Sequence, residues 1–173
     1  MDIRLGGLET AQVGALLAEH VEDMRRYSPP ESVPALDRDR LRTPDLTFWS
    51  AWEGAEVLGC AALRELDPTH GELKSMRTAP AHRRRGVAAA LLDHVVAEGR
   101  RRGYTRLSLE TGAPAEFAPA RTMYAAYGFT PCGPFGPYVD DEFSVFMTLV
   151  LDTPLSETPV SETPVSKTQA LAP

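Results

Sequence analysis

The feature that most constrains the fold is an apolar strand, an arginine-rich turn and a long amphipathic helix, in succession between Gly71 and Gly103. The turn and the start of the helix consist of Arg83, Arg84, Arg85, Gly86, Val87, Ala88 and Ala89. The first N–H groups of a helix have no partner within it, so with the helix dipole and nearby guanidinium groups they attract anions. Small residues also let a ligand approach the backbone closely. We therefore predict that this turn binds a pyrophosphate.

Hydrophobic periodicity predicts a series of strands and helices around this unit. The predicted strands are 3–5, 46–51, 57–66, 72–78, 106–110, 129–132 and 144–151. The predicted helices are 10–26, 35–41, 86–102 and 118–127. Short turns join strands 46–51, 57–66 and 72–78, which favours an antiparallel meander. Helix 86–102 then connects strand 72–78 to strand 106–110, a pattern typical of a right-handed crossover.

Charge and cysteine content narrow the class of ligand. The chain has 173 residues and a formal net charge of −6, so its arginine clusters form one basic site on an acidic protein. This favours a discrete anionic ligand and argues against nucleic acid as a partner. Two cysteines are too few for a disulfide framework or a four-ligand zinc site, and no metal is expected. No apolar run reaches the length of a membrane span and the first residues lack a signal-peptide core, so we expect a cytoplasmic protein without a membrane partner.

The composition changes at residue 152. Three copies of one five-residue unit, TPLSE, TPVSE and TPVSK, follow one another. Proline at every fifth position forbids a continuous helix or strand, so residues 152–173 are predicted to be a disordered tail. Residues 1–151 are predicted to form a single domain.

Two segments beside the arginine-rich turn carry a resemblance to a known family. Residues 72–80 (ELKSMRTAP) precede the turn, and residues 120–129 (ARTMYAAYGF) follow it at a characteristic distance. In this order and spacing the segments resemble the GNAT superfamily of acetyl-CoA-dependent N-acetyltransferases. Three further segments together resemble a bacterial small-molecule subgroup of that family: residues 107–112 (LSLETG), 134–138 (PFGPY) and 144–147 (SVFM). The resemblance covers roughly residues 3–150. It implies an α/β (α+β) fold with a mixed, mostly antiparallel sheet of six to seven strands, splayed between strands 4 and 5 and flanked by about four helices.

The resemblance also implies roles for individual residues. It assigns the pyrophosphate of acetyl-CoA to residues 83–89 and the pantetheine arm to the backbone of Met76, Arg77 and Thr78. Tyr124 matches the tyrosine that protonates the departing thiolate, and Glu72 matches a common position of the general base. The implied reaction transfers an acetyl group to the amine of a small molecule by direct attack in a ternary complex, without a metal. Phe117 stands where the family frequently has an asparagine, which puts one contact to the cofactor arm in doubt.

Several alternatives remain open from the residues themselves. Rivals of Glu72 as the base are Glu110, His70 and Glu142, whereas His20 and His94 are expected at helix surfaces or boundaries. The residues expected to line the acceptor site are Arg25, Arg26, Trp49, Arg77 and Tyr138. An arginine there could hold a carboxylate, which would suggest an amino-acid-like amine. The alternative functions are a non-catalytic acyl-CoA-binding module and a protein or peptide N-acetyltransferase, and both a monomer and a homodimer are compatible with the sequence.

Overall fold

The computed structural model describes residues 1–27 and 40–151, and its central element is one seven-stranded sheet. The strands lie in the order β1-β2-β3-β4-β5-β7-β6. Their bounds are Asp2–Leu5 (β1), Leu46–Glu53 (β2), Glu56–Asp67 (β3), His70–Thr78 (β4), Arg106–Gly112 (β5), Thr130–Cys132 (β6) and Ser144–Val150 (β7). Neighbouring strands are antiparallel except for β4 and β5, which are parallel. The predicted mixed, mostly antiparallel sheet is therefore confirmed.

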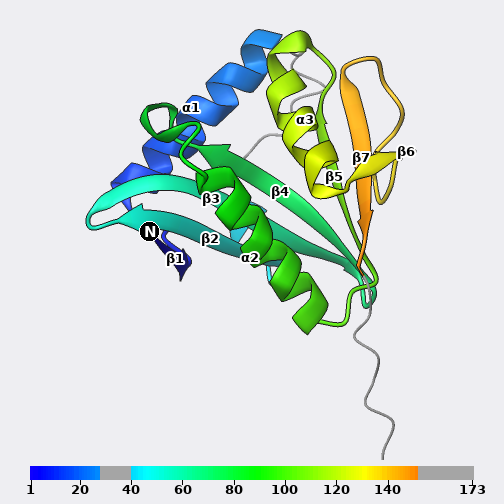
Figure 1. Cartoon of the computed structure of the whole chain (residues 1–173), viewed down its shortest axis with the longest axis horizontal. Coiled ribbons are helices and arrows are strands. Elements are labelled where there is room, and N and C mark those ends of the chain that lie inside the picture. Colours follow the sequence, from blue (N-terminus) through cyan, green and yellow to red (C-terminus); the bar gives the residue numbers. More distant parts are fainter. Residues whose placement is uncertain (28–39, 152–173) are drawn as a thin grey trace, which may run out of the picture.

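The parallel pair β4–β5 is joined over a short distance only. Its register consists of three residue pairs, from His70 opposite Arg106 to Glu72 opposite Ser108. Beyond these pairs the two strands diverge, and the sheet opens as a V between them (Figure 1). In contrast, β5 and β7 pair over seven residues. The splay therefore lies between the fourth and fifth strands, as the family resemblance implied.

Helices cover both faces of the sheet. The α-helices are Ala11–Tyr27 (α1), Val87–Arg101 (α2) and Ala118–Tyr127 (α3). Short 3-10 turns occupy Arg40–Arg42 (η2), Pro80–His82 (η3) and Ala115–Phe117 (η4). One apolar cluster joins α2 and α3 to one face of the sheet, and a second joins α1 to the other face. The buried stripe of α2 (Val87, Leu91, Leu92, Val95 and Val96) has the helical spacing from which that helix was predicted.

A β-bulge interrupts β4 halfway along its length. Cys60 and Ala62 of β3 stand opposite Arg77 and Lys74 of β4, so β4 contains one residue more than β3 in this interval. Ser75 lies in the bulge with a φ of 51°, a left-handed conformation that is uncommon for a residue with a side chain. A bulge disrupts the ladder and redirects neighbouring groups. In this chain it lies beside the opening between β4 and β5.

Two details differ from the sequence-based expectation or fall outside it. Among the described residues there are three α-helices rather than about four. Most of the helix predicted at 35–41 lies outside the described residues, and residues 40–42 form a 3-10 turn. The predicted disordered tail, residues 152–173, also lies outside them.

Candidate active site

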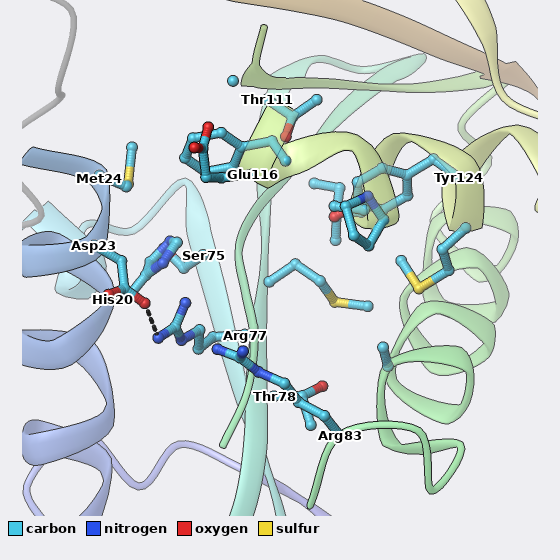
Figure 2. A pocket seen from close by; sticks show the side chains of 18 of the residues that line it. His20, Asp23, Met24, Ser75, Arg77, Thr78, Arg83, Thr111, Glu116 and Tyr124 are labelled. Carbon is cyan, nitrogen blue, oxygen red and sulfur yellow. Dashed lines mark hydrogen bonds and ion pairs between the residues drawn. The ribbon is translucent and has the colours of Figure 1, made fainter. Parts of the chain in front are cut away.

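A cavity of about 1400 Å³ lies in the opening of the sheet. Its walls come from α1, β4 from Glu72 onward, the start of α2, the end of β5 and α3. Figure 2 shows His20, Asp23 and Met24 of α1 on one side of the cavity and Tyr124 of α3 on the other. The β4 residues lie between these two groups. The cavity therefore has one side that is lined by α1 and another that is lined by α2 and α3. The cavity thus brings residues 72–78, Arg83, Arg84 and residues 86–89 together with Tyr124.

One end of the cavity is formed by the arginine-rich turn. Gly86 is the N-cap of α2 with a φ of 81°, and no side chain caps the helix. Arg84 also has a positive φ, 58°. The first N–H groups of α2 consequently lack a side-chain acceptor and lie at the positive end of the helix dipole. Arg83 and Arg84 line the same end, so the predicted anion site has the appropriate groups.

Arg85 has a different position from its two neighbours. Its guanidinium group contacts Nδ1 of His82 at 2.7 Å and donates to the Glu53 carboxylate at 3.3 Å. Nε2 of His82 in turn lies 2.9 Å from Glu56. These contacts point to the β2–β3 turn, and Arg85 does not line the cavity. The Arg85 side chain therefore links the arginine-rich turn to the β2–β3 turn on the outside of the cavity. The sequence had placed it among the residues that bind the cofactor.

Glu72 lies in a buried polar cluster in the middle of the cavity wall. The side chain is 1% exposed. Its Oε1 accepts a hydrogen bond from Nζ of Lys74 at 2.7 Å and another from the hydroxyl of Tyr138. Lys74 also donates to the Tyr138 hydroxyl at 2.7 Å. An ammonium group and a phenol thus stabilise the negative charge of Glu72 and fix the orientation of its carboxylate.

Unpartnered polar atoms are concentrated along this cavity. Among the described residues, five buried side-chain atoms make no hydrogen bond: His20 Nδ1, Glu72 Oε2, Ser75 Oγ, Arg77 Nε and Thr78 Oγ1. All five residues line the cavity. A buried polar group without a partner is costly, so their concentration indicates a place where a polar ligand supplies the missing partners.

Tyr124 faces the cavity from the α3 side. Its side chain is 6% exposed and packs against Phe129, with ring centroids 5.6 Å apart. Burial raises the pKa of Tyr124 well above its ordinary value. The phenol therefore keeps its proton throughout the neutral range and is available as a donor.

Arg77 links β4 to α1. Its guanidinium group donates to Glu19 at 3.3 Å and to Asp23, and the side chain is 12% exposed. The hydrogen bond from Arg77 lowers the pKa of Asp23. Burial lowers the pKa of the neighbouring His20 to about 4, so this imidazole is neutral at neutral pH. His20, which was expected at a helix surface or boundary, is half-buried in the cavity wall.

The predicted rivals of Glu72 have different environments. Glu110 lines the cavity and accepts a hydrogen bond from Ser144 at 3.0 Å, and burial raises its pKa. His70 is buried outside the cavity lining, with Nε2 2.7 Å from the Ser108 hydroxyl. Glu142 is exposed and does not line the cavity. Of the three rivals, Glu110 alone is positioned to meet a ligand there.

The predicted acceptor lining is correct in part. Arg77 and Tyr138 line the cavity. Trp49 does not, because it is packed in the core on the α2 face of the sheet, against His94. Arg25 and Arg26 are exposed near the end of α1 and also lie outside the lining.

Sequence reasoning expected the first helix to line the acceptor site but selected Arg25 and Arg26, and it missed the role of Lys74. The helical signal was present, because the α1 residues that line the cavity are spaced as one helix face: Glu19, His20, Asp23, Met24 and Tyr27. Lys74 follows Glu72 at the spacing that places both side chains on one face of a strand. Neither spacing shows which residues from other parts of the chain lie on the opposite side of the cavity.

The splayed sheet, the uncapped helix start and the position of a tyrosine on α3 are the features that the resemblance to acetyltransferases implied. A profile of the Acetyltransferase (GNAT) family matches residues 14–129, more than half of the chain. The chain therefore belongs to the GNAT family of acetyltransferases.

Individual relatives agree with this assignment. The uncharacterized N-acetyltransferase YsnE of Bacillus subtilis (strain 168) is 53% identical over 148 residues, which are 86% of this chain and 98% of the relative. An IAA acetyltransferase of Azospirillum brasilense is 36% identical over 73% of this chain and 85% of its own length. Among solved structures, an acyl-CoA N-acyltransferase of inferred activity from Klebsiella pneumoniae subsp. pneumoniae has a TM-score of 0.69 and 25% identity, and the match covers 87% of this chain and 97% of that one. None of the described helices is both long enough and apolar enough to cross a membrane.

Proposed function

We propose that the protein transfers an acetyl group from acetyl-CoA to the amine of a small molecule. The observation that carries this proposal is the continuity of the cavity. It runs from the uncapped start of α2 to the unpartnered Oε2 of Glu72, with Tyr124 beside it. A donor with a pyrophosphate at one end and a thioester at the other fits this arrangement. The relative from Azospirillum brasilense, named an IAA acetyltransferase, is in keeping with a small-molecule acceptor.

The start of α2 and β4 hold the donor in this proposal. The N–H groups at residues 86–89 and the Arg83 and Arg84 side chains bind the pyrophosphate. Beyond Glu72, β4 has no ladder partner on the β5 side, so its backbone at Met76, Arg77 and Thr78 can pair with the amides of an extended pantetheine arm. The unpartnered Thr78 hydroxyl, which faces the cavity, adds a donor or acceptor along this path.

The catalytic groups act on opposite sides of the thioester. Glu72 takes a proton from the attacking amine, directly or through one water, because an ammonium group has no free electron pair. The amine nitrogen then forms a bond to the carbonyl carbon, and a backbone N–H at the bulge stabilises the developing oxyanion. As the carbon–sulfur bond breaks, the electron pair moves to sulfur and Tyr124 gives its proton to the thiolate. The products are an amide and free coenzyme A.

The proposal is tested by coenzyme A release with an amine panel, together with calorimetry of acetyl-CoA binding. Tyr124→Phe keeps the ring against Phe129 and should lower kcat about 10- to 1000-fold with little change in acetyl-CoA affinity. Tyr127→Phe is the matched control, since Tyr127 also lies on α3 but donates to Asp93 and does not line the cavity. Glu72→Gln should lower kcat/KM most strongly at low pH.

The outcomes separate an enzyme from a non-catalytic acyl-CoA-binding module. Unchanged turnover in both Tyr124→Phe and Glu72→Gln would show that the assigned roles are wrong. Tight acetyl-CoA binding without coenzyme A release for any amine would favour the binding module.

A further inference from the structure

The α1 side of the cavity carries more carboxylates than cations. Glu19 and Asp23 of α1 and Glu72 and Glu110 of the sheet line this side, and Glu116 lines the cavity from η4, which leads into α3. The cations on this side are Lys74 and Arg77, whereas Arg83 and Arg84 lie at the anion-binding end. His20 adds no charge near neutral pH, because burial lowers its pKa to about 4. The half of the cavity that faces the acceptor is therefore acidic.

Both cations on this side are already paired within the protein. Lys74 donates to Glu72 and to the Tyr138 hydroxyl. Arg77 donates to Glu19 and Asp23 through one terminal nitrogen. Carboxylates of the protein already offset both positive charges, which disfavours a substrate carboxylate as their partner and so argues against the amino-acid-like acceptor; the unpartnered Nε of Arg77 can still donate to an uncharged ligand atom.

Glu110, in contrast to Lys74 and Arg77, has no ion-pair partner within the described ranges. It lines the cavity from β5 and accepts a neutral hydrogen bond from Ser144, and no Lys, Arg or His within the described ranges forms an ion pair with it. Burial raises its pKa, and the Ser144 hydrogen bond and the charge of Lys74 offset this effect only in part. A cationic group on a ligand would supply the remaining compensation.

A second observation shows that a ligand is expected beside this carboxylate. Glu72, at 1% exposure, has an Oε2 atom with no partner among the described residues, and the side chain lines the cavity. In the proposed reaction this atom meets the amine that is acetylated. The amine therefore approaches on the same face of the sheet as Glu110.

We propose that the acceptor carries a second cationic group in addition to the amine that is acetylated, and that Glu110 binds this second group. The inference rests on the proposed acetyltransferase function. Glu72 stands opposite Ser108, and Glu110 lies two residues further along β5 on the same face. With the usual strand rise and spacing, the Cα atoms of the two glutamates are about 8 Å apart before any splay is added. A short diamine can place one nitrogen at each carboxylate.

Three amines of similar length that differ in the far end of the molecule test this proposal: putrescine, butylamine and γ-aminobutyrate. Their far ends are cationic, neutral and anionic. Coenzyme A release by the full chain should give a kcat/KM for putrescine at least about tenfold above that for butylamine, because a charge-assisted hydrogen bond forms only with the diamine. γ-Aminobutyrate should be the poorest of the three.

Glu110→Gln keeps the shape of the side chain and removes its charge. It should reduce the preference for putrescine over butylamine to about threefold or less, mainly through a higher KM for putrescine. Glu142→Gln is the matched control, since it removes the same charge from an exposed residue that does not line the cavity. This control should keep the wild-type preference.

Each outcome has a distinct meaning. Equal or better turnover of γ-aminobutyrate would overturn the dicationic acceptor while leaving the acetyltransferase function intact. An equal loss for all three amines in Glu110→Gln would show that Glu110 serves a step common to all acceptors and does not bind the second charge. If acetyl-CoA binds but no amine releases coenzyme A, the proposed function fails and this inference fails with it.

Discussion

The buried ion pair between Glu72 and Lys74 gives a prediction that does not depend on any substrate. Replacing Lys74 by Met removes the ammonium group that lies 2.7 Å from Glu72 and keeps an unbranched side chain of similar length. Glu72 is 1% exposed, so its charge would remain in a poorly solvated place with Tyr138 as its remaining donor. Removing one partner of a fully buried pair costs about 3–5 kcal/mol. Because Lys74 is 20% exposed and the phenol remains, we expect a loss of about 2–3 kcal/mol.

Urea denaturation followed by the fluorescence of the two buried tryptophans measures this loss. The double variant Glu72→Gln/Lys74→Met removes both charges and should recover most of it, to within about 1 kcal/mol of the wild type. Arg101→Met is the control, since it breaks an ion pair of the same 2.7 Å separation in which the arginine is 72% exposed and Arg102 still pairs with Glu98; it should shift the midpoint little. A loss below about 0.5 kcal/mol for Lys74→Met would refute the reasoning, because Glu72 could not then be a buried charge that depends on Lys74.

Three further variants test other parts of the structure. Arg85→Gln should raise the KM for acetyl-CoA about three- to tenfold in steady-state assays with little change in kcat. The reason is that the arginine-rich turn loses its contacts with His82 and Glu53. An unchanged KM would contradict this expectation. The pKa of His20 is lowered from 6.5 to about 4, so the wild type should lose stability as pH falls from about 6.5 through 4, by about 3 kcal/mol in denaturation experiments. His20→Gln should weaken this dependence, and an identical pH profile would speak against it. Gly59→Ala would place a Cβ atom 2.5 Å from the Arg77 carbonyl oxygen. It should lower the free energy of unfolding by about 1–3 kcal/mol, which a lower Tm would show. A wild-type Tm would mean that β3 and β4 can separate there at no cost.

Much of the fold could be predicted because its signals are local. The runs of strand-forming residues between turn residues and the apolar stripe of the long helix depend on neighbouring residues only, and the strands and the helix predicted from them are confirmed. The anion-binding turn is also local, since it needs only a helix start with small residues beside arginines. Its assignment to acetyl-CoA came from the family resemblance.

The remainder of the site depends on pairings between distant segments. Trp49 was misplaced because β2 is buried on both faces over most of its length, so its pattern does not reveal which face meets the cavity. Tyr138 and Glu72 are 66 positions apart in sequence, and no local pattern joins them. The same holds for Arg77, whose partners on α1 are more than 50 positions away. Even a local motif does not predict every side-chain position. The three consecutive arginines do not reveal that the Arg85 side chain points away from the cavity.

The short parallel pairing of β4 with β5 has a consequence for solubility. Beyond Glu72, β4 presents an unpaired edge within the molecule, and such edges readily recruit strands of other chains. Helix α1 lies on one side of this edge and α3 on the other (Figure 1). Protection of the edge from pairing with another chain therefore depends on these helices, which pack against the sheet. Substitutions that loosen either helix should therefore promote aggregation by strand addition before they unfold the domain. A bound donor that pairs with this edge would act against aggregation.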